Sequence, residues 1–188
     1  MSVSPFGRIS AMQFVEQQGP LTLILKEGAL APVEVDFEYL KNATDNFSEE
    51  RILGKGAFGD VFRGIDVATH DFFAVKKMSS QFLGNAATPE QRAAAVRTYD
   101  REITALTKFS HVHIVRLIGF SAPPSGERVL IYEYLSRGSL EGVLKNDESS
   151  ALFTWPLRVR CLRDVAVALT FMHVGNKCFH RDVKAANI

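Results

Sequence analysis

Cysteine is scarce in this sequence, which has two, Cys161 and Cys178, among 188 residues. Two cysteines are too few for a disulfide framework, and their spacing matches no metal-ligand motif. We therefore expect reduced thiols in an intracellular protein. An excess of charge of either sign is also lacking, because 22 Lys and Arg residues are balanced by 21 Asp and Glu residues. The resulting net charge of +1 indicates no nucleic-acid partner.

Long hydrophobic runs are lacking as well. The longest early run, Leu21–Leu25, is far too short to span a bilayer. The N-terminus has no charged region followed by a secretory hydrophobic stretch, so we expect a cytoplasmic protein without a transmembrane segment. A hydrophobic content of 46% and a charged content of 23% are typical of a soluble globular chain. The length favours one domain with a sizeable core, and there are no internal repeats.

The first 35 residues carry no recognisable motif. Residues 1–35 are interpreted as an N-terminal extension of uncertain order, in which Leu21–Lys26 is compatible with a short strand. Residues 36–48 are predicted to form a flanking helix that begins at an Asp36 N-cap and runs through Phe47. Its apolar side chains at helical spacing are Phe37, Leu40, Ala43 or Thr44, and Phe47.

Three strands are predicted next, at Arg51–Gly54, Asp60–Asp66 and Asp71–Met78. The first two flank the glycine-rich loop Gly54-Lys55-Gly56-Ala57-Phe58-Gly59. A lone G-x-G-x-x-G also fits a Rossmann loop, but that loop opens a helix, whereas Asp60–Gly64 continues as a strand. A hairpin of this kind lets glycine backbone approach phosphate groups closely, with Phe58 at the tip closing over them. A plain tight hairpin is the alternative.

The third strand ends with Ala74-Val75-Lys76-Lys77. On an alternating strand, Ala74 and Lys76 share one face and Val75 lies on the other. A lysine at a strand end is usually solvated, and we expect this for Lys77. Lys76 is instead the candidate for binding phosphate.

A long helix is predicted after the loop Gln81–Ala87. It begins with a capping box at Thr88-Pro89-Glu90-Gln91 and ends near Lys108. Glu102 falls within its apolar stripe, which consists of Val96, Tyr99, Ile103 and Leu106. A carboxylate on a buried face needs a cation, so we predict an ion pair between Glu102 and Lys76. A solvated glutamate is the alternative.

A turn and a fourth strand follow at His111–Gly119, where the histidines are interpreted as packing or turn residues because no further ligands cluster with them. Val129–Tyr132 reads as a buried strand that continues through Glu133 into a Gly/Ser-containing hinge at Ser136–Ser139. Such a connection is typical of a link between two lobes. Tyr132 would then lie at the rear of a pocket.

The C-terminal part is predicted to be helical. Ser139 starts a short helix, Asn146–Ser150 form a polar loop, and Thr154 caps a long helix that ends at Gly175. The apolar stripe of this helix is interpreted as core rather than as a cofactor site, and it consists of Leu162, Val165, Leu169 and Met172.

The last nine residues, His180–Ile188, bring together groups suited to phosphoryl transfer. Asp182 can accept a proton from an attacking hydroxyl, and Lys184 can stabilise charge on the moving phosphoryl group. The side-chain carbonyl of Asn187 can bind Mg²⁺. The spacing His-Arg-Asp-x-x-x-x-Asn is the catalytic-loop pattern of protein kinases.

With the glycine loop, Lys76, Glu102, the hinge and His180–Asn187 in this order, residues 47–188 resemble a eukaryotic protein kinase domain. Lys184 resembles the serine/threonine type of catalytic loop. Finer features resemble the Pelle/interleukin-1-receptor-associated kinase and plant receptor-like kinase group. These features are Ala43–Ser48, His111–Phe120, Tyr132–Tyr134, Gly138–Leu140 and Thr154–Pro156.

The resemblance implies an α+β, protein-kinase-like fold: a five-stranded antiparallel small lobe with one long helix, a hinge, and the first helices of a helical large lobe. It implies catalytic roles for Asp182, Lys184, Lys76 and Glu102, a Mg²⁺ role for Asn187, and ATP as cofactor. Backbone groups of Glu133 and Leu135 would bind the adenine edge. The implied nucleotide-binding residues are Leu53, Gly54, Lys55, Gly56, Ala57, Phe58, Gly59, Val61, Ala74, Lys76, Tyr132, Glu133 and Leu135.

The resemblance also implies a protein substrate with a serine or threonine hydroxyl, a receptor or adaptor complex as partner, and control through activation-loop phosphorylation because Arg181 precedes Asp182. No D-F-G segment follows Asn187, so we expect residues 49–188 to be a kinase domain truncated after the catalytic loop. Two functions stay open. One is a serine/threonine kinase present as an incomplete domain, and the other is an inactive kinase-like module that binds nucleotide or a partner.

Overall fold

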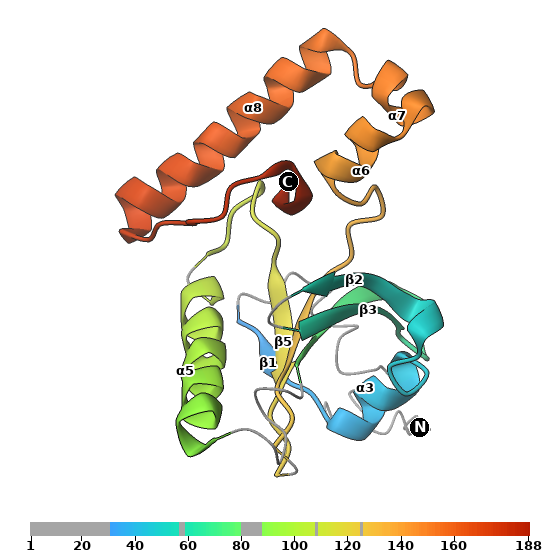
Figure 1. The fold of residues 1–188 in the computed structure, drawn as a ribbon, viewed down its shortest axis with the longest axis vertical. Coiled ribbons are helices and arrows are strands. Elements are labelled where there is room, and N and C mark those ends of the chain that lie inside the picture. Colours follow the sequence, from blue (N-terminus) through green and yellow to red (C-terminus); the bar gives the residue numbers. More distant parts are fainter. Residues whose placement is uncertain (1–30, 57–58, 80–87, 108, 125) are drawn as a thin grey trace, which may run out of the picture. The chain divides into compact units, whose positions relative to one another are not determined.

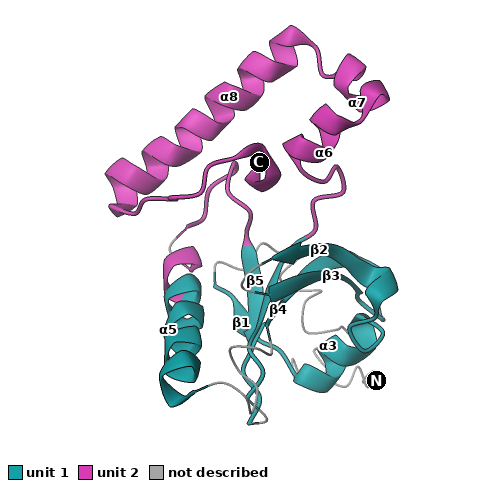
Figure 2. Ribbon diagram, viewed as in Figure 1, with its two compact units in different colours: residues 1–103, 117–133 teal, residues 104–116, 134–188 magenta. Residues whose placement is uncertain are grey.

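The computed structural model describes residues 31–56, 59–79, 88–107, 109–124 and 126–188 (Figure 1). The chain divides into two compact units (Figure 2). Unit 1 comprises residues 1–103 and 117–133, and unit 2 comprises residues 104–116 and 134–188. The boundary after Glu133 lies at the end of the predicted strand, shortly before the predicted hinge at Ser136–Ser139. Three predicted features lie outside the described residues: the strand at Leu21–Lys26, the loop tip at Ala57 and Phe58, and the loop Gln81–Ala87.

Unit 1 is built on a six-stranded sheet with the order β1-β5-β6-β4-β3-β2 (Figure 1). The strands are β1 (Val33–Glu34), β2 (Ile52–Gly56), β3 (Gly59–Ile65), β4 (Phe72–Met78), β5 (Leu117–Ser121) and β6 (Val129–Glu133). Five of them match the predicted strands, and their mutual pairing is antiparallel. The prediction of five strands was wrong by one, because β1 adds a parallel pair to β5 from within the N-terminal extension.

The core of unit 1 lies on one face of this sheet. In β4, Phe73 and Val75 are fully buried, whereas Ala74 and Lys76 are only partly buried, which confirms the predicted alternation. The flanking segment also contributes side chains to the core. The buried core residues are Val35, Leu40, Ala43, Phe62, Phe73, Val75, Ile118, Val129 and Ile131. Residues 33–47 are therefore packed against the sheet rather than appended to it.

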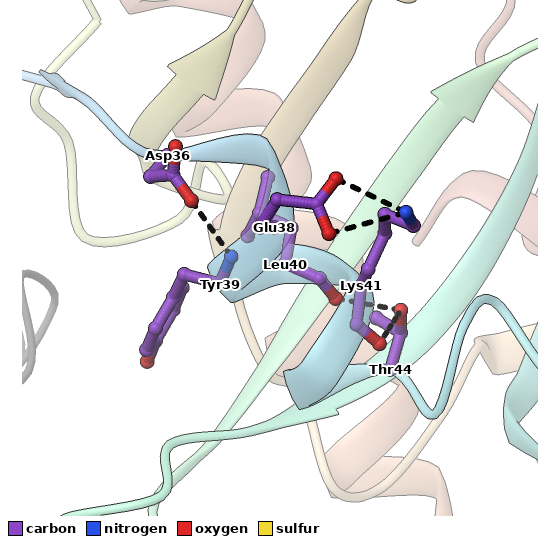
Figure 3. Close-up of polar contacts among 6 residues, drawn as sticks. All are labelled: Asp36, Glu38, Tyr39, Leu40, Lys41 and Thr44. Carbon is purple, nitrogen blue, oxygen red and sulfur yellow. Dashed lines mark hydrogen bonds and ion pairs between the residues drawn. The ribbon is translucent and has the colours of Figure 1, made fainter.

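Helix α3 (Phe37–Ala43) is the predicted flanking helix, and Asp36 caps it by accepting a hydrogen bond from the Tyr39 N–H at 3.0 Å (Figure 3). The helix ends at Ala43 rather than at Phe47. Residues 45–47 have φ values of 53° to 56°, which lie in the left-handed region and cannot continue a right-handed helix. The Thr44 hydroxyl stabilises this exit, since it donates to the Leu40 carbonyl at 2.7 Å and accepts from the Phe47 N–H.

A partly buried hydrogen bond joins α3 to the residue that follows β3. The Tyr39 hydroxyl donates to Oδ2 of Asp66 at 2.7 Å, and Asp66, at the end of β3, is fully buried. Burial opposes ionisation of this carboxyl, but hydrogen bonds from Tyr39 and from the N–H groups of Thr69 and Ala68 outweigh it, so the pKa of Asp66 lies below its usual value. A charged acceptor at this position makes the contact stronger than a neutral hydrogen bond.

Helix α5 (Pro89–Leu106) begins with the predicted capping box. The Gln91 N–H donates to the Thr88 hydroxyl at 3.2 Å, and the Thr88 N–H donates to the Gln91 side-chain oxygen at 2.8 Å. The N–H groups of Thr88 and Gln91, which have no acceptor within the helix, are thus both bound by local side chains.

Unit 2 contains α6 (Leu140–Lys145), α7 (Asp147–Leu152), α8 (Trp155–Thr170), the π-helical turn η2 (Phe171–Gly175) and the 3₁₀ turn η3 (Ala185–Asn187). The prediction of a polar loop at Asn146–Ser150 was wrong. Asn146 is instead an N-cap whose side chain accepts from the Ser149 N–H at 2.9 Å, and it starts α7. The predicted helical end at Gly175 is confirmed, although the last turn is π-helical.

The apolar stripe of α8 is only partly core. Met172 is buried, and with Val165 and Leu169 it lines a cavity of about 920 Å³ within unit 2. Leu162 is 64% exposed, so its prediction as a core residue was wrong. No helix within the described residues is long and apolar enough to cross a membrane.

The two histidines after α5 are packing and turn residues, as predicted. The His111 ring stacks on Phe171 at 4.8 Å, and Nδ1 of His111 accepts a hydrogen bond from the His113 N–H at 3.1 Å. The part of the chain that the structure describes contains no cluster of three or more His, Cys, Asp or Glu side chains arranged to hold a metal ion.

Candidate active site

The glycine-rich segment forms the predicted hairpin. Gly54 pairs with Val61, and Gly56 pairs with Gly59 where β3 begins, which excludes the helix that a Rossmann loop would open. Gly59 has a φ of 148°, and a Cβ atom at this position would lie 2.1 Å from the Lys77 carbonyl oxygen. Only glycine fits here, because the backbone of β4 at Lys77 occupies the space that a side chain of residue 59 would need.

Four of the predicted nucleotide-binding side chains share one face of the sheet. Val61 is the cross-strand partner of Lys76, and Ala74 is the partner of Tyr132. Directly opposed residues of antiparallel strands project to the same side, and Ala74 and Lys76 alternate with the buried Phe73 and Val75. The sheet therefore sets a small side chain, a lysine and a tyrosine side by side, opposite its core.

Lys76 and Glu102 form the predicted ion pair. The Lys76 ammonium lies 2.8 Å from Oε1 and 3.0 Å from Oε2 of Glu102. The two side chains retain only 22% and 26% of their exposure. Because β4 supplies the lysine and α5 supplies the glutamate, the ion pair fixes the end of Lys76 relative to a second element.

Tyr132 completes this group, in a contact that sequence reasoning missed. Its hydroxyl donates to Oε1 of Glu102 at 2.6 Å, the oxygen that also accepts from Lys76. Burial, and then the adjacent Glu102 carboxylate, raise the pKa of Tyr132 above its usual value, so the hydroxyl keeps its proton and stays a donor. The predicted position of Tyr132 at the rear of the pocket was the available signal.

In unit 2, the catalytic-loop residues are brought together. Oδ2 of Asp182 lies 2.9 Å from the Lys184 ammonium and accepts a hydrogen bond from the Asn187 amide at 2.9 Å. The same amide also donates to the Asp182 carbonyl at 2.8 Å. The hydrogen bonds from Lys184 and then Asn187 hold the pKa of Asp182 below its usual value. At neutral pH this carboxylate is ionised and acts only as an acceptor.

The backbone holds this loop in a specific shape. Arg181 has a φ of 65°, an unusual value for a residue other than glycine. The Asn187 N–H donates to the Lys184 carbonyl within η3, and the Leu140 N–H of α6 donates to the Ile188 carbonyl at 2.7 Å. The loop is thus anchored on both sides of Asn187, and the strained residue directly precedes Asp182, where such strain is often found at functional sites.

The remaining predicted residues are distributed over both units. Leu53, Gly54, Lys55 and Gly56 lie on β2 and are exposed, and Glu133 ends β6. Leu135 belongs to unit 2, where it is 57% exposed.

The donor set of the loop fits a hard cation. Asp182 carries carboxylate oxygens, and Asn187, whose amide nitrogen donates to Asp182, carries a side-chain carbonyl oxygen. Mg²⁺ prefers oxygen ligands and is commonly bound through one or two protein groups together with substrate phosphates.

A family model of the protein kinase domain matches residues 47–188. Cysteine-rich receptor-like protein kinase 29 of Arabidopsis thaliana is 35% identical over 176 residues, covering 91% of this chain and 24% of the relative. The probable serine/threonine-protein kinase PBL28 of the same plant is 34% identical over 153 residues, covering 79% of this chain and 38% of the relative.

The chain thus spans less than two fifths of the length of either relative. Among solved structures, an apo pseudokinase superposes with a TM-score of 0.69 at 21% identity, covering 99% of this chain and 58% of the other. This likeness concerns the fold alone.

Proposed function

This chain belongs to the protein kinase domain family, and from that premise we propose that it binds ATP with Mg²⁺ and transfers the γ-phosphoryl group to a serine or threonine hydroxyl of a protein. The observation that carries the proposal is the Lys76–Glu102 ion pair at 2.8 Å. In kinases this pair must be in place for phosphoryl transfer, because the lysine binds the α- and β-phosphates.

Unit 1 supplies the nucleotide cradle in this proposal. The glycine hairpin of β2 and β3 covers the phosphates, and Ala74 leaves room for the adenine ring on the same face as Lys76. Within this unit, backbone groups of Glu133 at the end of β6 bind the adenine edge. Tyr132 closes the rear of the cradle and holds Glu102 in position for Lys76.

Unit 2 supplies the chemistry. Asp182 orients the attacking hydroxyl by accepting its hydrogen bond, and takes its proton as the phosphoryl group leaves ATP. The lowered pKa of Asp182 keeps this carboxylate ionised at neutral pH, so it can accept the hydrogen bond of the hydroxyl. Lys184, two residues after Asp182, neutralises charge on the phosphoryl oxygens. Its presence at this position resembles the serine/threonine type of catalytic loop, which is the reason for proposing serine and threonine substrates.

Mg²⁺ would be held by Asn187 through its side-chain oxygen, with Asp182 beside it. When bound, the ion neutralises charge on the β- and γ-phosphates.

The experiment is an ATP titration by calorimetry together with phosphotransfer from radiolabelled ATP to a serine- and threonine-rich protein such as casein. We expect ATP to bind the 188-residue chain, and Lys76→Met to weaken this binding. Lys77→Met is the matched control. Its ammonium lies 4.5 Å from the Phe47 ring centroid, so the substitution is expected to leave ATP affinity unchanged.

Phosphotransfer by the wild-type chain that is lost in Asp182→Asn supports the proposed kinase activity. ATP binding without transfer, in wild type and variants alike, supports the alternative of a nucleotide-binding module. Absence of measurable ATP binding by the wild-type chain refutes the proposal.

A further inference from the structure

Helix α5 carries Glu102 but buries little of its own surface. Of its 18 residues, Ala95 and Tyr99 are buried. They lie four residues apart and so share a face of the helix, and Glu102 follows Tyr99 by three residues on that same side. Tyr99 is the large side chain of the two and is 2% exposed. The position of this helix face on the sheet therefore depends strongly on one aromatic residue.

The Tyr99 hydroxyl reaches the end of the β5–β6 ladder. It lies 3.0 Å from the Ser121 carbonyl oxygen and 3.3 Å from the Val129 carbonyl oxygen. Ser121 and Val129 are cross-strand partners and form the last pair of this ladder. One donor thus bridges both strands at the point where their mutual pairing stops. Burial raises the pKa of Tyr99, so the hydroxyl keeps its proton and acts as a donor.

The strand that Tyr99 contacts also carries Tyr132. Val129 begins β6, and Tyr132, three residues on, donates to Glu102. The helix is therefore attached to β6 at two levels: through Tyr99 at the start of the strand and through Glu102 near its end. Lys76 on the neighbouring β4 joins the second attachment.

We propose that Tyr99 is a positioning residue, whose hydroxyl locks α5 to the β5–β6 hairpin and thereby holds Glu102 against Lys76. This inference rests on the proposed function, since the position of Lys76 matters only if it binds phosphate. Tyr99 touches neither nucleotide nor substrate and acts through Glu102.

The test uses Tyr99→Phe, which keeps the buried ring and removes the hydroxyl. Loss of one hydrogen bond is expected to make backbone amides of α5 exchange about two- to tenfold faster, while the amides of β3 and β4 keep their rates. The affinity ratio of ATP to adenosine is expected to fall by up to the same factor, because adenosine has no phosphate for Lys76 to bind. Tyr39→Phe is the matched control. It removes the hydroxyl with which Tyr39 of α3 donates to Asp66, and it should leave the exchange rates of α5 unchanged relative to those of β3 and β4.

A double-mutant cycle separates positioning from a merely structural role. If Tyr99 acts through Glu102, then Tyr99→Phe lowers the ATP-to-adenosine ratio in the wild type but has no further effect in Glu102→Gln. Additive effects of the two substitutions would overturn the inference, as would unchanged α5 exchange in Tyr99→Phe. A wild-type chain that binds ATP no better than adenosine would refute the proposed function instead, and the exchange rates of α5 would still decide whether Tyr99 locks the helix.

Discussion

Replacing Glu102 by glutamine should destabilise unit 1, because it leaves the Lys76 ammonium without the carboxylate that contacts it at 2.8 Å. Removing one partner of a fully buried ion pair costs about 3–5 kcal/mol. The Lys76 and Glu102 side chains retain 22% and 26% of their exposure, so solvent offsets part of this cost, and we expect a loss of about 2–3 kcal/mol in the free energy of unfolding. The double variant Lys76→Met/Glu102→Gln leaves no unpaired charge and should cost less than the sum of the single variants, by about 1–2 kcal/mol.

The assay must report on unit 1 alone. The only tryptophan, Trp155, lies on α8 in unit 2, so its fluorescence follows the other unit. Hydrogen exchange at the backbone amides of β4 and β6 is the suitable measurement. A loss of 2–3 kcal/mol corresponds to exchange that is about 30- to 150-fold faster. Glu90→Gln, on the exposed first turn of the same helix, should leave these rates unchanged. Acceleration below about threefold in Glu102→Gln, or additive costs in the double variant, would refute the reasoning.

Three further substitutions test other contacts. Tyr39→Phe should lower the free energy of unfolding by urea at pH 7 by about 1.5–3 kcal/mol, because the acceptor Asp66 is charged. Since the folded pKa of Asp66 is depressed, the difference between wild type and variant should hold above about pH 4 and shrink as Asp66 is protonated at lower pH. A difference that stays constant with pH would contradict this prediction. Gly59→Ala should destabilise the hairpin by more than about 2 kcal/mol, because its Cβ atom would lie 2.1 Å from the Lys77 carbonyl oxygen; an unchanged thermal midpoint would contradict it. Asn146→Ala should cost about 1 kcal/mol by loss of the α7 cap, measured as reduced helical circular dichroism, with Asn146→Asp as the variant that retains capping.

Local signals in the sequence were sufficient for most of the fold. The capping box at Thr88 and Gln91 and the alternation of β4 depend on residues a few positions apart, and both predictions are confirmed. The helix α7 was missed even though its signal was present. Asn146 is followed by two acidic residues in the first turn, which is the pattern of a capped helix start, but the polar composition of the segment favoured a loop.

Contacts between distant residues could not be predicted from local pattern. Strand β1 has two residues, too few to show any alternation, and its partner β5 lies more than eighty residues further along the chain. The hydrogen bonds from Tyr39 to Asp66 and from Tyr132 to Glu102 likewise join residues 27 and 30 positions apart. The Lys76–Glu102 contact was predictable because a carboxylate within an apolar stripe demands a cation, whereas a buried tyrosine demands no particular partner.

The catalytic loop illustrates the same limit at short range. The spacing of Asp182, Lys184 and Asn187 indicated their chemistry, but not that the Asn187 amide would donate to Asp182. This orientation depends on η3 and on the left-handed Arg181, and backbone strain of that kind has no signature in composition or periodicity.

The strand order of unit 1 has a consequence for how the chain is made. Strand β4 ends at Met78, but its neighbour β6 begins only at Val129. At 5–20 residues per second, a ribosome needs roughly 3–10 s to synthesise the intervening segment. During that time β4 has β3 on one side and an open edge on the other, and open edges invite pairing with other chains. The open edge of β4 is therefore exposed to mispairing until β6 has been synthesised.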